Sequence, residues 1–210
     1  MSSTQPRRSA GAASNWNVPN VLTVIRIILV PLMVVLLFLG PDGDGLRIWP
    51  TVVFAVAMLT DFLDGTIARK YNLITDFGKL WDPIADKALT GAAFISLTIL
   101  QLPTGGSELP WYFTVIILVR EWGITWLRDR LKQQGFIMAA NSGGKLKTLT
   151  QTAALLLFLL DLQWLPGPLQ VIAWVLMWAA LILTVVTGID YLREARRVTK
   201  TPPAQRPEEQ

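Results

Sequence analysis

The sequence predicts an all-α polytopic membrane protein with six transmembrane helices and both termini in the cytoplasm. Three observations lead to this prediction. Of the 210 residues, 52% are hydrophobic and only 16% are charged, whereas about a quarter of the residues are charged in ordinary soluble domains. The apolar residues gather in six runs, each close to the ~20 residues that a bilayer-spanning helix needs. The connections between these runs alternate sharply in their content of Lys and Arg.

The six apolar runs cover residues 21–40, 48–66, 80–101, 111–130, 147–163 and 168–190. No cleavage site of small residues follows the first run, so that run predicts an anchored helix and not a signal peptide. Residues 15–197 are therefore expected to form one membrane domain. The flanking segments 1–14 and 198–210 are polar and rich in Pro and Ser or Gln, a composition that predicts disordered tails.

The orientation follows from the basic residues of the connections. The segments "GPDGDGLR", "QLPTGGSELP" and "DLQWLPG" together hold a single basic residue, Arg47, whereas the other connections and both ends carry clusters of Lys and Arg. The positive-inside rule places these clusters, and both termini, in the cytoplasm. Trp49, Trp111 and Trp164 then fall at the predicted outer ends of their runs, where an interfacial aromatic belt is expected.

Composition also limits the chemistry that the chain can perform. It contains neither cysteine nor histidine. A disulfide framework is therefore excluded, and so is the commonest side chain for general base catalysis and transition-metal binding. Any reaction must depend on carboxylates, basic side chains, hydroxyls and metal ions with oxygen ligands. We expect no nucleic-acid partner.

Four aspartates stand at the ends of two apolar runs. Asp61 and Asp64 end the second run in "TDFLDG", and Asp82 and Asp86 begin the third in "DPIAD". The second run passes inward and the third outward, so both pairs are expected near the cytoplasmic surface. Spacings of three and four residues place each pair on one helix face. A simpler interpretation is open for Asp82, which with Pro83 fits a helix N-cap followed by a first-turn proline.

Clustered carboxylates beside hydrocarbon need a physical explanation. A charged side chain at the bilayer centre costs about 2.5–3.5 kcal/mol on insertion scales, and four like charges also repel one another unless protons or cations compensate them. Surface carboxylates at helix ends are common, so any single one could be incidental. Together, however, their oxygen ligands favour two hard divalent cations, Mg²⁺ or Mn²⁺. A two-metal carboxylate site is suited to phosphoryl-type displacement.

The residues between the two pairs fit a phosphate ligand. Gly65 and Ala68 are small and would let a ligand approach the helix backbone closely. The planar guanidinium of Arg69 can donate two parallel hydrogen bonds to phosphate oxygens. Gly78 is again small and stands four residues before Asp82. A small residue alone on a membrane helix more often marks helix packing. Combined with four aspartates and an arginine, these residues indicate a site.

Residues 61–86 read D-x2-D-G-x2-A-R-x8-G-x3-D-x3-D. This pattern resembles the signature of the CDP-alcohol phosphatidyltransferases, membrane enzymes with six spans that move a phosphatidyl group from a CDP-lipid to an alcohol. Three further stretches resemble the branch of the family whose acceptor is glycerol 3-phosphate: "NVPNVLTVIRI" from Asn17, "REWGITWLR" from Arg120 and "GKLKTLTQ" from Gly144.

The resemblance implies a role for each matching residue. The four aspartates would hold two divalent ions, and Asp86 would also be the general base. The expected CDP-lipid contacts are Asn20, Thr23, Gly65, Arg69, Thr75 and Gly78. Arg69 would bind the diphosphate and Thr75 would add a hydroxyl. Asn20 and Thr23 would line the nucleotide pocket, although helix capping explains either residue equally well.

The acceptor would need cations of its own, because glycerol 3-phosphate is a dianion at neutral pH. The candidates are Arg26, Arg120, Arg128, Lys145 and Lys147. The alternative for such residues is positive-inside anchoring with snorkelling side chains, which we expect for Arg130 and Lys132. Glu121 could pair with a neighbouring cation.

The expected reaction converts CDP-diacylglycerol and sn-glycerol 3-phosphate into phosphatidylglycerol phosphate and CMP. We expect the protein to lie among the membrane lipid of a bacterial plasma membrane as a multi-pass homodimer. Its active site is expected to face the cytoplasm. Within the family, inositol phosphate, serine or phosphatidylglycerol remain alternative acceptors. A cation or proton transporter is a remote alternative, because no acidic residue continues the aspartate cluster across the membrane. A purely structural membrane protein would leave the motif without a role.

Overall fold

A computed structural model describes residues 17–39, 46–71, 75–104, 109–136 and 142–200. These ranges contain six α-helices, one short 3-10 helix and no strand. The elements are α1 (Val18–Leu39), α2 (Ile48–Tyr71), α3 (Asp76–Thr104), α4 (Trp111–Gln133), α5 (Ser142–Leu159), η1 (Leu162–Trp164) and α6 (Gly167–Lys200). The all-α prediction is confirmed, with one helix for each apolar run.

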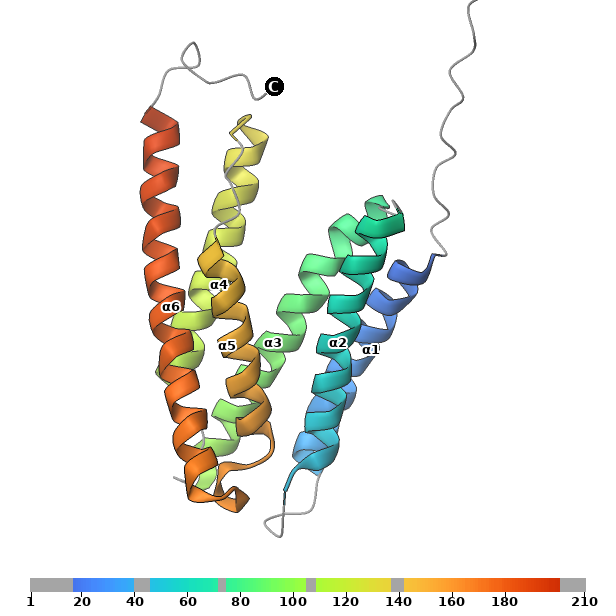
Figure 1. Ribbon diagram of the computed structural model, residues 1–210, viewed down its shortest axis with the longest axis vertical. Helices are drawn as coiled ribbons and strands as arrows, with labels where there is room; N and C mark the ends of the chain where they lie inside the picture. The colour runs from blue at the N-terminus through green and yellow to red at the C-terminus, as the bar shows by residue number, and fades with distance from the viewer. Residues whose placement is uncertain (1–16, 40–45, 72–74, 105–108, 137–141, 201–210) are drawn as a thin grey trace, which may run out of the picture.

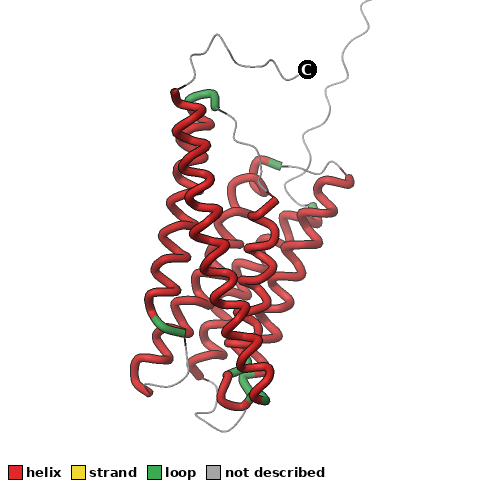
Figure 2. The backbone as a smooth tube through the Cα atoms, turned by 60° about the vertical axis from the view of Figure 1, so that its left-hand side comes forward, coloured by secondary structure: helices red, strands yellow, loops and turns green. Residues whose placement is uncertain are grey.

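The helices alternate in direction along the chain. The beginnings of α1, α3 and α5 point to the same end of the molecule as the ends of α2, α4 and α6, which is the upper end in Figure 1. The tube of Figure 2 shows the same alternation from a second direction. The end of α2 and the beginning of α3, which carry the four aspartates, therefore lie at one end of the molecule, together with the beginning of α1.

Within the residues that the structure describes, four helical segments are long and apolar enough to cross a membrane: Val18–Leu39, Ile48–Ile67, Trp81–Leu100 and Gly167–Thr199. The other two are more polar. Helix α4 carries Arg120 and Glu121 near its middle, and α5 begins with a polar stretch that contains Lys145 and Lys147. The chain thus has the character of a multi-pass membrane protein. The crossing of the membrane by α4 and α5, and the cytoplasmic position of the termini, stay predictions.

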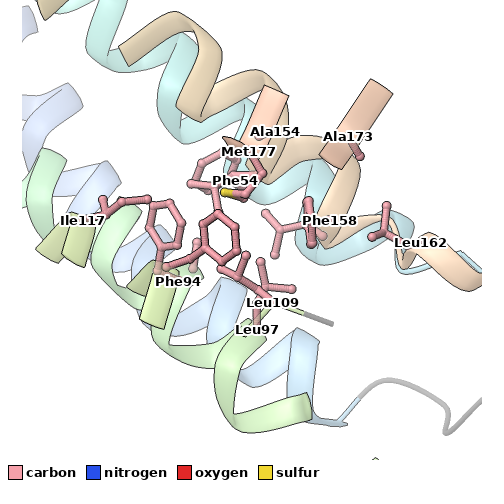
Figure 3. Close-up of a cluster of buried hydrophobic side chains, with 14 of the residues drawn as sticks. Phe54, Phe94, Leu97, Leu109, Ile117, Ala154, Phe158, Leu162, Ala173 and Met177 are labelled. Carbon is pink, nitrogen blue, oxygen red and sulfur yellow. The ribbon is translucent and has the colours of Figure 1, made fainter. Parts of the chain in front are cut away.

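The apolar core joins the two ends of the chain. Helix α1 packs along α2 and α5 packs along α6. Buried side chains from α1 to α6 form one cluster, part of which Figure 3 shows, and Phe54, Phe94, Phe158 and Met177 are almost fully enclosed in it. The ring of Phe158 lies edge-on to Trp174, with centroids 5.1 Å apart. Close van der Waals packing of this kind holds helices together in lipid, and it fixes how the polar ends of the helices face one another.

Candidate active site

Arg26 of α1 lies between the two aspartates of α2. Its side chain is fully buried, and Nη1 is 3.0 Å from Oδ1 of Asp61. Nη2 forms a close ion pair with Oδ2 of Asp64, which is itself almost fully buried. Nε donates a hydrogen bond of 3.4 Å to the carbonyl oxygen of Ala57. One guanidinium therefore compensates both carboxylates at a place where an uncompensated charge would be costly.

Thr23 stands three residues before Arg26 on the same helix. Its hydroxyl is within hydrogen-bonding reach of Oδ1 of Asp82 and lies 3.1 Å from the carbonyl oxygen of Pro19. Thr23 is completely buried. Helix α1 thus contacts an aspartate of α3 as well as the two aspartates of α2.

Three of the residues expected to contact the CDP-lipid meet beside Asp82. The Thr75 hydroxyl donates to Oδ1 of Asn20 over 2.8 Å and accepts from the backbone N–H of Gly78 over 3.1 Å. A Cβ on Gly78 would lie 3.1 Å from Oδ1 of Asn20 and 3.3 Å from Oδ2 of Asp82. The absence of a side chain at Gly78 therefore permits this close approach.

Asp86 is the second aspartate of α3. It is half-buried, one helical turn after Asp82. Its carboxyl group is close enough to Asp61, Arg26 and Glu121 to feel their charges. Charges on α1, α2 and α4 therefore act on Asp86.

The donor chemistry of the four aspartates fits a hard divalent cation, because it offers carboxylate oxygens from two adjacent helices. Among the residues that the structure describes, no three carboxylates converge closely enough to hold one ion. Arg26, at Asp61 and Asp64, provides the positive charge on the side of α1. The metal-ligand assignment of the aspartates stays a prediction.

A second charged group joins α4, α5 and α6. Oε1 of Glu121 lies 3.2 Å from Nη1 of Arg120 and forms a close ion pair with Nζ of Lys147. Arg120 also reaches α6, where Nε donates to the carbonyl oxygen of Thr184 over 3.2 Å and Nη2 donates to the Thr187 hydroxyl over 2.7 Å. Two of the predicted acceptor residues, Arg120 and Lys147, are therefore brought together through Glu121.

The remaining predicted site residues are placed differently. Arg128 stacks over the ring of Tyr191 at 5.8 Å, as Arg120 does, and Lys145 is exposed. Arg26, predicted as an acceptor residue, instead pairs with aspartates, so its acceptor role has no support from its contacts. Gly65 is half-buried on α2. The Arg69 side chain lies outside the part of the structure that is described.

Sequence reasoning missed the polar face of α6. Thr184, Thr187, Gly188 and Tyr191 recur at spacings of three, one and three residues, so they share one face of an otherwise apolar helix. A Cβ at Gly188 would lie 3.2 Å from Cγ of Arg120, so the glycine makes room for that side chain. Small and hydroxyl residues on one face of an apolar helix are the signal that could have identified a helix-packing surface.

Comparison with known proteins gives a consistent result. The sequence model for "CDP-alcohol phosphatidyltransferase" matches residues 16–186. A probable phosphatidylglycerophosphate synthase from Mycobacterium tuberculosis is 44% identical over 198 residues, which cover 93% of this chain and 90% of the relative.

Several other relatives carry the name CDP-diacylglycerol--glycerol-3-phosphate 3-phosphatidyltransferase. The protein from Bacillus subtilis is 35% identical over 199 residues, which cover 89% of this chain and 98% of the relative. The protein from Rickettsia typhi is 35% identical over 185 residues, which cover 86% of this chain and 97% of the relative. Because the family match extends over most of the helical bundle that carries the aspartates, the chain belongs to the CDP-alcohol phosphatidyltransferase family.

Proposed function

We propose that this protein transfers the phosphatidyl group of CDP-diacylglycerol to sn-glycerol 3-phosphate, giving phosphatidylglycerol phosphate and CMP. The observation that carries the proposal is that α1 gathers three aspartates of the motif, because Arg26 pairs with Asp61 and Asp64 and Thr23 is within hydrogen-bonding reach of Asp82. The names of the relatives from Bacillus subtilis and Rickettsia typhi support the same pair of substrates. The proposed setting is a bacterial plasma membrane, with the site on the cytoplasmic side and the protein as a homodimer.

Two Mg²⁺ or Mn²⁺ ions are the proposed cofactors, with Asp61, Asp64, Asp82 and Asp86 as their ligands. When bound, such ions would offset the negative charge of the diphosphate and of the departing CMP. Arg26 and Thr23 hold oxygens of three of these carboxylates from the side of α1. These contacts orient the carboxylates as outer partners commonly orient metal ligands.

Asp86 is the proposed general base. It accepts the proton of the 1-hydroxyl of glycerol 3-phosphate as that oxygen attacks the β-phosphorus of CDP-diacylglycerol. The new P–O bond joins glycerol to the phosphatidyl group, the bond to the α-phosphate oxygen breaks, and CMP leaves with the electron pair. Asp86 later returns the proton to solvent. Arg69 is proposed to compensate the diphosphate, and Asn20, Thr75 and Gly78 are proposed to line the nucleotide pocket.

Lys147 is the cation best placed for the acceptor phosphate. Three nitrogen atoms of Arg120 already have partners on α4 and α6. By contrast, Lys147 pairs with Glu121 and also feels the charge of Asp86. A phosphate could therefore replace Glu121 as the partner of Lys147 without breaking another hydrogen bond of that side chain.

Replacing Lys147 with methionine is expected to raise the KM for glycerol 3-phosphate about tenfold or more, because a charge-assisted hydrogen bond is worth roughly 1.5–3 kcal/mol. The KM for CDP-diacylglycerol should remain nearly unchanged. Initial rates of CMP release at varied concentrations of each substrate measure both constants. Arg130→Met is the matched control, because Arg130 is exposed on the last turn of α4. Equal acceptor constants for the two variants would show that Lys147 is only an anchor.

The proposed reaction is tested with purified protein in detergent micelles that contain CDP-diacylglycerol and Mg²⁺. Glycerol 3-phosphate, inositol phosphate, serine and phosphatidylglycerol are supplied separately, and CMP is measured. We expect rapid CMP release with glycerol 3-phosphate alone. Preference for another acceptor would keep the family chemistry and reject this substrate. No CMP with any acceptor, in protein that remains folded, would reject the proposed transfer.

A further inference from the structure

Glu121 forms ion pairs with two cations that come from different helices. Its Oε1 atom lies 3.2 Å from Nη1 of Arg120 on α4 and pairs closely with Nζ of Lys147 on α5. The side chains of Arg120, Glu121 and Lys147 are only 13%, 20% and 7% exposed. In such surroundings a cation without a counter-ion is strongly unfavourable. Glu121 therefore does for these cations what a bound anion would do.

The two cations differ in their number of hydrogen-bond partners. Arg120 is fixed from α6 by Thr184 and Thr187, whichever group its Nη1 atom faces. Within the described ranges, Glu121 is the one hydrogen-bond acceptor that the structure gives to the Lys147 ammonium group. Lys147 is thus the member of the group that can change partner without breaking another hydrogen bond.

A second observation on α5 points to a ligand at this place. Gln151 stands one helical turn after Lys147, on the same helix face, and is 5% exposed. Its Oε1 atom is buried without a hydrogen-bond partner among the described residues. Buried polar atoms nearly always have a partner, and an amide oxygen accepts a hydrogen bond from a hydroxyl group. This face of α5 therefore offers a cation for a phosphate and an acceptor for an alcohol.

We propose that Glu121 is a positioning residue that holds Lys147 as a counter-ion until the phosphate of glycerol 3-phosphate takes its place. The inference rests on the proposed function. A phosphate dianion brings more negative charge and more acceptor oxygens than one carboxylate, so it can displace Glu121 from Lys147. The product retains this phosphate group, and the return of Glu121 to Lys147 then favours product release.

Replacing Glu121 with glutamine tests the exchange, because the amide keeps the size of the side chain and removes its charge. We expect the KM for glycerol 3-phosphate to fall about threefold to tenfold, since the competing charge is gone. We expect kcat to fall, because product release slows, and the KM for CDP-diacylglycerol to stay unchanged. Without acceptor the variant should unfold at a lower temperature than the wild type, and glycerol 3-phosphate should raise its unfolding temperature by more.

Two further variants make the test specific. Asp190→Asn removes a carboxylate from α6 that pairs with Arg193 over 3.9 Å at the surface, and it should leave all these values unchanged. Glu121→Asp keeps the charge but shortens its reach, so it should change the acceptor KM in the same direction by less. It serves as the test if Glu121→Gln does not fold.

The outcomes separate the inference from the proposed function. If the wild type transfers to glycerol 3-phosphate but the Glu121 variants show an unchanged or higher acceptor KM, Glu121 is a structural partner of Lys147 and the exchange is wrong. If folded wild type releases no CMP with glycerol 3-phosphate, the proposed function fails first and the inference fails with it. A lower acceptor KM together with a lower kcat supports both.

Discussion

Replacing Asp86 with asparagine is expected to abolish CMP release while the protein still folds and inserts. The amide keeps the shape of the side chain, but it cannot accept the proton of the attacking hydroxyl. General base catalysis alone contributes about 10²–10⁴-fold to a rate, and asparagine would also be a weaker ligand for a divalent cation. Initial rates of CMP release with purified protein measure the loss.

Asp190→Asn is the matched control for this variant, because Asp190 is an exposed carboxylate on α6. Its rate should equal that of the wild type. Turnover of the Asp86 variant at the wild-type rate would remove Asp86 as the base and would direct attention to Asp61, whose side chain is 35% exposed.

Replacing Arg26 with methionine is expected to destabilise the protein by roughly 3–5 kcal/mol, the usual result of removing one partner from a buried ion pair. The loss arises because Asp61 and Asp64 would both remain near hydrocarbon without their shared cation. Arg26→Lys keeps the charge but lacks the fork that reaches both carboxylates, so its loss should be intermediate. Thermal unfolding in detergent, without divalent ions, measures these differences.

Arg47 provides the comparison for Arg26. It pairs with Asp161 over 3.4 Å, and its side chain is 24% exposed. Methionine at this position should therefore lower the unfolding temperature much less than methionine at Arg26, because partial exposure weakens an ion pair. Similar losses for the two variants would contradict the role of Arg26 as the counter-ion of the aspartates.

The arrangement of the aspartates could be predicted from the sequence to a large extent. Apolar runs fixed the order of the helices, and spacings of three and four residues put the aspartates of each pair on one face. The structure places the end of α2 and the beginning of α3 at the same end of the molecule. The partner of these residues could not be predicted in this way. Arg26 reaches Asp61 and Asp64 because α1 packs along α2, and the spacing within α1 does not specify that packing.

Local spacing is likewise insufficient for the second charged group, which Arg120, Glu121 and Lys147 form. Arg120 and Lys147 were both predicted as cations for the acceptor phosphate, because glycerol 3-phosphate is a dianion at neutral pH. Thr184 and Thr187 were not predicted as partners of Arg120, because their spacing can indicate a helix-packing face but does not specify which side chain packs there. The meeting of Asn20 with Thr75 likewise joins residues 55 positions apart. The family resemblance grouped these two residues, whereas local spacing could not.

If the aspartate group is a two-metal site for phosphatidyl transfer, each chain should bind two Mn²⁺ ions. Electron paramagnetic resonance can count bound Mn²⁺ in purified protein supplied with CDP-diacylglycerol, whose diphosphate would add oxygen ligands to those of the aspartates. We predict two bound ions in the wild type and loss of binding when Asp61 and Asp64 are both replaced with asparagine. No tightly bound Mn²⁺ in folded wild type, or equal binding by wild type and double variant, would contradict the account.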